Sequence, residues 1–407
     1  MTFTGKALLG AFLLGTATVG ALPAAAQQQA AAPKLNISNG ARPAVKALQD
    51  AVAAKNYAGI DALVAAANAK ASTAEDRYAI GRMAVSAGLA TKNDTLAAAG
   101  IQQTLASGLL PADQANVFKL EQARIRYRAN DYTGAITVLE PLANSDPALT
   151  DAALLLSDSY NKQKQPAQAY AALQKAVAAN RAAGRPIPAE WLKQSLALAY
   201  NGKLPGVQTA LMDWIRADPK PENFRDAARI YAETRQIPNN DQIDLYRLQR
   251  AAGVLKGESD FFNYSNAALL KGFPGEAKAV LDEGFASGAI NKSRPAFRDV
   301  YTTASSKVAA DQAALASTER TGLAAPTARQ ALVAGDVFLG YGDYAKAAAL
   351  YRAALTKSGA DKDLTNLRLG MALARAGDKA GAAAALQSVG GTQQGIAQLW
   401  QAWAATR

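Results

Sequence analysis

Two residue types are missing from this sequence of 407 residues, which contains no cysteine and no histidine. Their absence excludes a Ser-His-Asp triad, a Cys-His nucleophile, haem ligation by histidine and the usual zinc sites with nitrogen and sulfur ligands. No disulfide can form, so cysteine usage says nothing about the redox compartment. We therefore expect a protein that is not an enzyme and that has no metal and no cofactor, although carboxylate, lysine, tyrosine or serine-lysine chemistry stays open.

Aromatic residues are also scarce, at 7% of the chain, and no long run of alternating valine, isoleucine and threonine predicts a strand. The abundant residues are good helix formers: alanine, leucine, glutamine, lysine and arginine. A single compact core stops growing above about 250–300 residues. The sequence therefore predicts an all-α protein, either of two or three domains or as an array whose units pack on their neighbours.

The first residues have the composition of an export signal. Lys6 supplies a positive charge, an apolar run interrupted by glycine follows, and Ala24, Ala25 and Ala26 provide small residues for cleavage. We expect residues 1–26 to be removed, residues 27–42 to form a disordered leader, and the mature protein to be periplasmic and not membrane-spanning.

A repeat of about 34 residues runs through the rest of the chain, and it is clearest near the end. Two consecutive segments share six positions, each offset by 35 residues. The matched pairs are Gly335 and Gly370, Gly342 and Gly377, Asp343 and Asp378, Ala347 and Ala382, Tyr351 and Leu386, and Ala354 and Val389. Such a period predicts helical hairpins, since a helix with one apolar stripe needs a partner, and glycine tolerates the positive φ of a helix end.

The unit from Gly335 to Ala354, with Gly342, Asp343 and Tyr344 at its turn, resembles the tetratricopeptide repeat family. The resemblance implies a right-handed α-α superhelical solenoid of stacked helical hairpins, eight to ten in number. Weaker copies begin near Lys55, Asn130 and Phe261. Residues 71–115 and 293–326 are helical by composition only, and residues 221–256 predict two helices without the glycine and alanine markers.

Two interruptions predict how the array is divided. Pro186 and Pro188 break the helical pattern, and residues 317–326 are a second candidate hinge. We expect an N-terminal array over residues 43–183, a middle array over 184–316, and a C-terminal pair of repeats over 317–407. The last segment ends with Trp400 and Trp403 on one helix face, as in a helix that caps the array.

Single carboxylates give little sign of catalysis. Asp336, Asp343 and Asp378 are interpreted as parts of the repeat, with cap or turn roles. The string Glu258-Ser259 resembles the catalytic glutamate of lytic transglycosylases, but the downstream motifs of that family are missing. We interpret Glu258 as the beginning of a repeat.

The resemblance implies that the first helix of each hairpin lines a concave groove, where the family binds its partners. The groove positions carried over to this sequence predict partner-binding residues at Arg124, Tyr127, Arg128, Asp158, Asn161, Lys162, Asn266 and Arg375. The cations among them suit an acidic peptide. The alternative is that they are ordinary groove residues without a fixed ligand.

Positive charge is in excess, with a formal net charge of +11. Residues 160–203 contribute strongly, since Glu190 is their only acid beside seven basic residues: Lys162, Lys164, Lys175, Arg181, Arg185, Lys193 and Lys203. Two functions are predicted: a scaffold that binds a protein or peptide of the cell envelope, or an accessory module that binds an anionic glycan or lipid headgroup through this basic stretch. Nucleic acid is not an expected partner. The stretch is also consistent with a solvated helix face that keeps the protein in solution.

Overall fold

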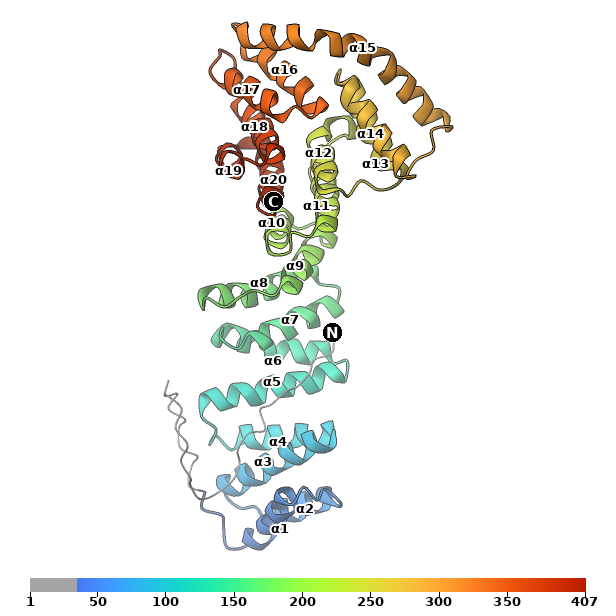
Figure 1. Cartoon of the computed structure of the whole chain (residues 1–407). Helices are drawn as coiled ribbons and strands as arrows, with labels where there is room; N and C mark the ends of the chain where they lie inside the picture. Colours follow the sequence, from blue (N-terminus) through green and yellow to red (C-terminus); the bar gives the residue numbers. More distant parts are fainter. Residues whose placement is uncertain (1–34) are drawn as a thin grey trace. The chain divides into compact units, whose positions relative to one another are not determined.

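The computed structural model describes residues 35–407, which form twenty α-helices and two short 3-10 helices (Figure 1). The expected export signal, residues 1–26, lies outside the described residues. The chain divides into two compact units, Met1–Phe118 and Lys119–Arg407, and their border falls inside helix α5 (Ala112–Arg128). The all-α prediction is confirmed. None of the described helices is long and apolar enough to cross a bilayer.

The first unit contains two hairpins. They are built by α1 (Arg42–Ala53), α2 (Ile60–Asn68), α3 (Ala74–Thr91) and α4 (Asp94–Ala106). Helices α3 and α4 pack closely because Gly81, Gly88 and Gly100 face the opposite helix at positions where a Cβ atom would lie less than 3 Å from its atoms. Residues 71–115, predicted as helical from composition alone, are thus one more hairpin.

Part of the expected leader is ordered, and a buried carboxylate explains why. The Ser38 N–H and hydroxyl donate to Asp76 at 2.9 and 2.7 Å, and the backbone N–H groups of Ser72 and Thr73 donate to the same carboxylate. Burial alone would raise the pKa of Asp76, but these hydrogen bonds outweigh it and hold the pKa well below its usual value. The disordered leader predicted for residues 27–42 is therefore wrong from residue 35 onward.

Each hairpin turn of the described chain has a residue with positive φ soon after its first helix, and these residues give the repeat count. The nine turn residues are Lys55, Lys92, Asn130, Lys164, Lys203, Gln236, Gly272, Gly342 and Gly377. Nine hairpins lie within the expected range of eight to ten. Only three of the nine turn residues are glycine, which explains why the repeat is hard to follow from its glycine markers.

Residues that lie 35 positions apart in the two last repeats make equivalent contacts in the structure. Gly335 approaches the ring of Tyr351 closely, as Gly370 approaches the side chain of Leu386, and a Cβ at either glycine would collide. Asp343 and Asp378 each cap the following helix by accepting a backbone N–H, from Lys346 and Gly381. Ala347 and Ala382 are fully buried. The tetratricopeptide-like repeat predicted from these positions is confirmed.

The second unit contains the other helices. They are α6 (Tyr132–Ser145), α7 (Thr150–Lys162), α8 (Pro166–Ala182), α9 (Ala189–Asn201), α10 (Val207–Ala217), α11 (Pro221–Thr234), η1 (Asn239–Asp241), α12 (Ile243–Ala252), α13 (Gly257–Leu270), α14 (Pro274–Ala286), α15 (Pro295–Ala324), α16 (Ala328–Tyr341), α17 (Tyr344–Leu355), α18 (Lys362–Ala376), α19 (Lys379–Gln387), η2 (Gly391–Gln393) and α20 (Gln394–Ala404).

The structure departs from the expected sub-arrays. Residues 293–326, predicted only as helical, contain one 30-residue helix, α15 (Pro295–Ala324), and this helix continues through the expected boundary at residue 317. The loop with Pro186 and Pro188 does separate α8 from α9, but these helices pack on each other. Val177 of α8 and Leu192 of α9 belong to one apolar core, so the array is continuous at this point.

The last helix closes the second unit on itself. Helix α20 packs on α18 and α19 and also on α10, α11 and α12, which lie far earlier in the sequence, between Val207 and Ala252 (Figure 1). The indole N–H of Trp400 donates to the backbone oxygen of Asp244 at 3.0 Å, and Gly395 lies against the ring of Tyr231. Helix α20 thus covers the last hairpin, as expected of a capping helix, and it also packs against the middle of the array, which the sequence did not predict.

Candidate functional site

Six of the predicted partner-binding residues lie on two neighbouring helices, α5 and α7, and four of them bind side chains of the same two helices. The Tyr127 hydroxyl donates to Asp158, Arg124 forms an ion pair with Asp151 at 2.7 Å, and Arg128 lies 3.4 Å from Glu121. Asn161 and Lys162 are exposed at the end of α7. These residues therefore share one surface on which most of the charges are already paired, and their role in binding a partner stays a prediction.

The other two predicted residues lie elsewhere in the second unit. Asn266 lies on α13, where its amide nitrogen is 3.5 Å from the side-chain oxygen of Asn240. Arg375 lies on α18 with its guanidinium 5.0 Å from the ring centre of Tyr344. Each of them lies next to a feature that the repeat pattern did not predict.

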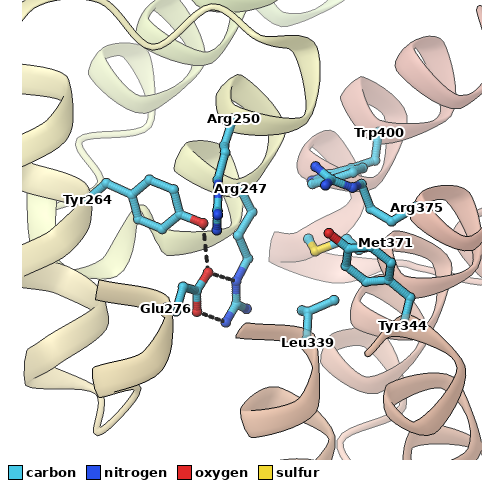
Figure 2. Close-up of a pocket in the computed structure, with 9 residues that line it drawn as sticks. All are labelled: Arg247, Arg250, Tyr264, Glu276, Leu339, Tyr344, Met371, Arg375 and Trp400. Atoms are coloured by element: carbon cyan, nitrogen blue, oxygen red, sulfur yellow. Dashed lines mark hydrogen bonds and ion pairs between the residues drawn. The ribbon is translucent and has the colours of Figure 1, made fainter. Parts of the chain in front are cut away.

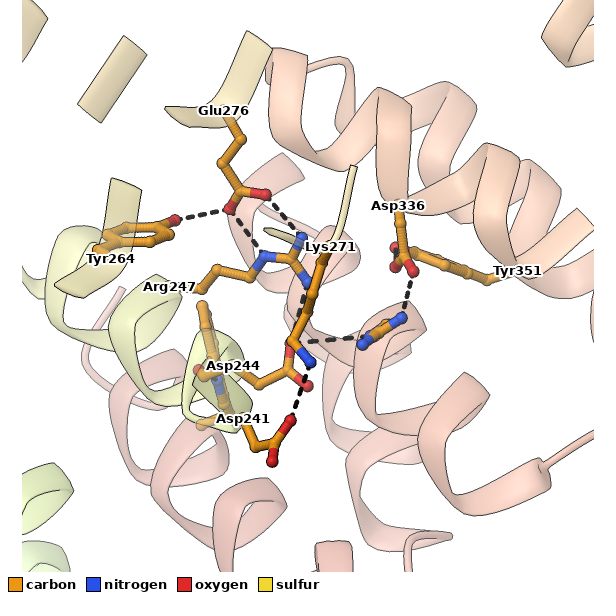
Figure 3. A network of polar contacts seen from close by, with 10 residues as sticks. Asp241, Asp244, Arg247, Tyr264, Lys271, Glu276, Asp336 and Tyr351 are labelled. Carbon is orange, nitrogen blue, oxygen red and sulfur yellow. Dashed lines mark hydrogen bonds and ion pairs between the residues drawn. The ribbon is translucent and has the colours of Figure 1, made fainter. Parts of the chain in front are cut away.

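A buried network of charged side chains joins α12, α14, α16 and α18 (Figure 3). The guanidinium of Arg247 donates to both oxygens of Glu276, at 2.8 and 2.7 Å, and to Asp244 at 3.0 Å. Arg368 pairs with Asp336, and its Nε lies 3.7 Å from Asp244. The hydroxyl groups of Tyr264 and Tyr351 donate to Glu276 and Asp336, so every one of these carboxylates has a partner.

The network holds three carboxylates and two guanidinium groups. Burial opposes the charged form of Glu276, but Arg247 outweighs it and lowers the pKa of this carboxyl. For Asp336 burial prevails and raises the pKa, in spite of Arg368 and Arg247, and Asp244 acts in the same direction as burial. Paired buried charges of this kind fix the geometry of the helices that carry them, because removing one partner leaves the other charge uncompensated.

The interpretation of Asp336 made from the sequence is wrong. This residue was interpreted as a cap or turn residue that recurs with the repeat, yet it lies in the middle of α16 and is 3% exposed. The equivalent position 35 residues later is Met371. The recurring aspartates Asp343 and Asp378 are caps, as expected, whereas Asp336 belongs to the buried network.

Helix α12 forms part of a cleft of about 440 Å³ together with α11 and α13, which we call the polar cleft. Clefts of this size accommodate small ligands or a short stretch of polypeptide. Its charged side chains pair with each other, Arg225 with Asp260 at 3.0 Å and Arg229 with Glu233 at 3.2 Å. The rest of the lining is mainly amides and hydroxyls, from Gln236, Asn239, Gln242, Tyr246, Gln249, Ser259 and Asn263.

Gln249 is the least satisfied side chain of the polar cleft. It is 6% exposed, and its amide oxygen is buried without a hydrogen-bond partner among the described residues. A buried acceptor without a donor costs free energy, so native proteins rarely keep one without a reason. Beside it the buried Tyr246 has its pKa raised to about 12 by burial and by the charge of Asp260, so it stays a neutral donor. The arrangement suits a ligand that brings an N–H or O–H group to Gln249.

One signal for this cleft is visible in the sequence. Residues 221–256 lack the glycine and alanine markers of the repeat, and this segment contains α11 and α12, which line most of the cleft. Asn266, which was predicted, lies one turn after Asn263 of the lining. Gln249 itself has no sequence signal, because its burial depends on how α11, α12 and α13 pack.

Glu258 lies outside the polar cleft, at the first turn of α13, and forms an ion pair with Arg294. Its place at the beginning of a hairpin agrees with the interpretation made from the sequence.

The basic stretch of residues 160–203 divides into two groups. Lys162, Lys164 and Lys203 are exposed at two neighbouring hairpin turns, whereas Arg181, Arg185 and Lys193 lie near the loop that joins α8 to α9. Helix α8 separates the groups, and its 17 residues span about 25 Å. The positive charges thus do not gather at one point.

No protein-family model matches this sequence, and no curated protein does either. Among solved structures, the chain is similar to PilF of Pseudomonas aeruginosa at 14% identity, over 64% of this chain and 96% of that one, with a TM-score of 0.28. It is similar to a tetratricopeptide repeat protein of Parabacteroides merdae at 12% identity, over 83% and 100% of the two chains, with a TM-score of 0.29. RapI matches at 11% identity, over 78% and 96%, with a TM-score of 0.27. These superpositions are too loose to support an argument, so the tetratricopeptide-like assignment rests on the turns and close contacts of the chain itself.

Proposed function

We propose that this protein is a non-catalytic scaffold that binds a polypeptide partner, and that the polar cleft on α11, α12 and α13 is its main contact site. The observation that carries the proposal is the buried, unpartnered amide oxygen of Gln249 in a cleft whose charges are already paired.

The chemistry of the lining favours a polypeptide. A peptide backbone presents N–H donors and C=O acceptors in turn, and side-chain amides can both donate and accept. Gln249 offers an acceptor, and Gln236, Asn239 and Asn263 surround it with further amides. Because Arg225 and Arg229 are neutralised by Asp260 and Glu233, the cleft does not select for a strongly charged ligand.

We further propose that the protein works in the bacterial cell envelope. The support is the sequence of residues 1–26, which has the charge, the apolar run and the small residues of an export signal. Fusing these residues to a reporter that is active only after export tests this part, and a reporter that stays inactive would contradict it.

The binding proposal is tested by capturing partners of the tagged full-length protein in cells, with crosslinking and mass spectrometry. We expect the wild type to retain a reproducible polypeptide in high salt, because the amide contacts of the cleft depend little on ionic strength. Gln249→Met should lose this polypeptide. Gln208→Met removes a similar half-buried amide on α10, outside the cleft, and should keep it. Equal capture by both variants would refute the cleft as the contact site.

A second candidate function is binding of an anionic glycan or envelope polymer by the basic stretch. The exposure of Lys162, Lys164 and Lys203 at adjacent turns favours it. In the same capture experiment, this function predicts a polymer that is released as salt rises, with no effect of Gln249→Met.

A further inference from the structure

Helix α12 lines a second, smaller pocket with its other face. While Tyr246 and Gln249 face the polar cleft, Arg247 and Arg250 line a pocket of about 30 Å³ that we call the arginine pocket. Its opposite wall consists of side chains from α16, α17, α18 and α20, including Tyr344, Arg375 and Trp400 (Figure 2). The pocket lies where the closure of the second unit brings the two walls together.

Two of the charged groups in this pocket already satisfy each other. Both oxygens of Glu276 accept hydrogen bonds from Arg247, and one of them also accepts the hydroxyl of Tyr264 at 2.7 Å. Both oxygens of Glu276 therefore already accept hydrogen bonds from its own wall of the pocket, and Glu276 does not pair with Arg375 on the opposite wall.

The other two cations keep free donors. Arg250 uses its Nε and Nη2 for Glu283, at 3.0 and 2.5 Å, while its Nη1 donates to no group in residues 35–407. Arg375 has no carboxylate within ion-pair distance in the same residues, and its guanidinium lies over the ring of Tyr344. Arg247 and Arg250 thus have carboxylate partners in Glu276, Asp244 and Glu283, and Arg375 is the cation of the lining that has none among the described residues.

We propose that the arginine pocket binds a phosphate group between Arg250 and Arg375. Guanidinium groups on opposite walls suit an anion with acceptor oxygens on several sides, which a tetrahedral phosphate presents and a planar carboxylate does not. The volume of about 30 Å³ is roughly twice what one water molecule needs, so only the phosphate group itself enters. The rest of any larger ligand lies outside the mouth, where the side chain of Arg250 is 22% exposed.

Binding at this place would join the two walls of the closed unit. The walls come from α12–α14 and from α16–α20, and a bound phosphate would bridge them through Arg250 and Arg375. A ligand that binds only the folded state stabilises it according to its concentration and affinity. Phosphate is thus expected to raise the melting temperature of the full-length protein in a saturable way.

The test measures thermal unfolding of the full-length protein with increasing inorganic phosphate against chloride at equal ionic strength. We expect a saturable rise in melting temperature for the wild type and for Arg352→Gln, which removes an exposed arginine of α17 outside the pocket. Arg375→Gln should lose the rise, and Arg375→Lys should keep part of it. Phosphorus NMR line broadening gives a second readout that does not depend on a change in stability.

A second arm asks whether the phosphate is free or belongs to a lipid. Phosphatidylcholine vesicles that contain phosphatidic acid are floated with the wild type, with Arg375→Gln and with Arg352→Gln. One outcome supports a lipid headgroup as the source of the phosphate. In it, inorganic phosphate has no effect, the wild type and Arg352→Gln bind these vesicles, and Arg375→Gln does not. A lack of response in both arms, or an equal response in Arg375→Gln, overturns the proposal. This outcome is independent of the polar cleft.

Discussion

The helices α5–α8, from Lys119 of α5 onward, and the helices α10–α20 belong to the same compact unit, but they are stabilised in different ways. In α5–α8 each hairpin packs on the next, around a local core of residues such as Leu139, Leu156 and Leu173. In α10–α20 one core, which includes Leu211 and Trp403, joins α10–α12 to α16–α20 because the last helix returns to the middle of the array, while α13–α15 pack around a neighbouring core with Phe261. The first region is the open array that the repeat predicts, whereas the second is closed.

The two regions also differ in their charges. The pair of Arg124 and Asp151 on α5 and α7 has side chains that are 37% and 57% exposed, whereas Arg247 and Glu276 in the closed region are 5% and 3% exposed. Exposed pairs contribute little to stability, while a buried pair is costly to break. The comparison suggests that the closed region is the rigid part of this unit, and it is also the region that contains both pockets.

The largest effect is expected from removing the contact that closes the second unit. Trp400 is 1% exposed and donates to the backbone of α12, so Trp400→Ala should lower the free energy of unfolding by about 3–5 kcal/mol. Trp191→Ala makes the same change in α9, where the ring is only partly buried, and should cost clearly less. Urea unfolding of both full-length variants measures the difference, and equal losses would contradict a special role for the closure.

A similar but more local loss is expected from the buried charge network. Glu276→Gln keeps the shape of the side chain but leaves Arg247 without its main partner, which should cost about 3–5 kcal/mol. Asp151→Asn breaks the exposed pair with Arg124 and should cost less than about 1 kcal/mol. If urea unfolding shows the same loss for both, the distinction between the two regions is wrong.

The smallest effect has the opposite sign. Gln249→Met removes a buried acceptor without a donor and should raise the free energy of unfolding by about 1 kcal/mol. Gln208 also has a buried amide oxygen without a donor, but Gln208→Met loses the hydrogen bond from this amide to Thr234 as well, so its gain should be smaller. A loss of stability in Gln249→Met would mean that this amide serves the fold, and the argument for a ligand in the polar cleft would fail.

The sequence predicts contacts within a hairpin better than contacts between distant helices, for a physical reason. Turn residues, caps and alanine contacts act within one hairpin, so a period of 35 residues at Gly342, Gly377, Asp343 and Asp378 is enough to find them. Trp400 and Asp244 are in contact although they are 156 residues apart in the sequence, and a local sequence pattern does not predict such a contact.

The residues of the candidate sites are likewise hard to predict where they come together from distant helices. Arg375 was predicted from its place in a repeat, but its neighbour across the arginine pocket, Arg250, comes from a segment without repeat markers. The buried position of Gln249 likewise depends on three helices together. An irregular segment in a regular repeat, here residues 221–256, was the only local sign that a site was present.

The measurement that tests the account most directly is site-specific photocrosslinking of the full-length protein in cells. A photoreactive phenylalanine analogue replaces Asn263 in the polar cleft or, in a second variant, Asn161 on the open surface of α7. The account predicts a discrete crosslinked polypeptide from position 263 that Gln249→Met abolishes, and none that depends on Gln249 from position 161. Crosslinks from position 161 alone would contradict it and would place the partner on the open array.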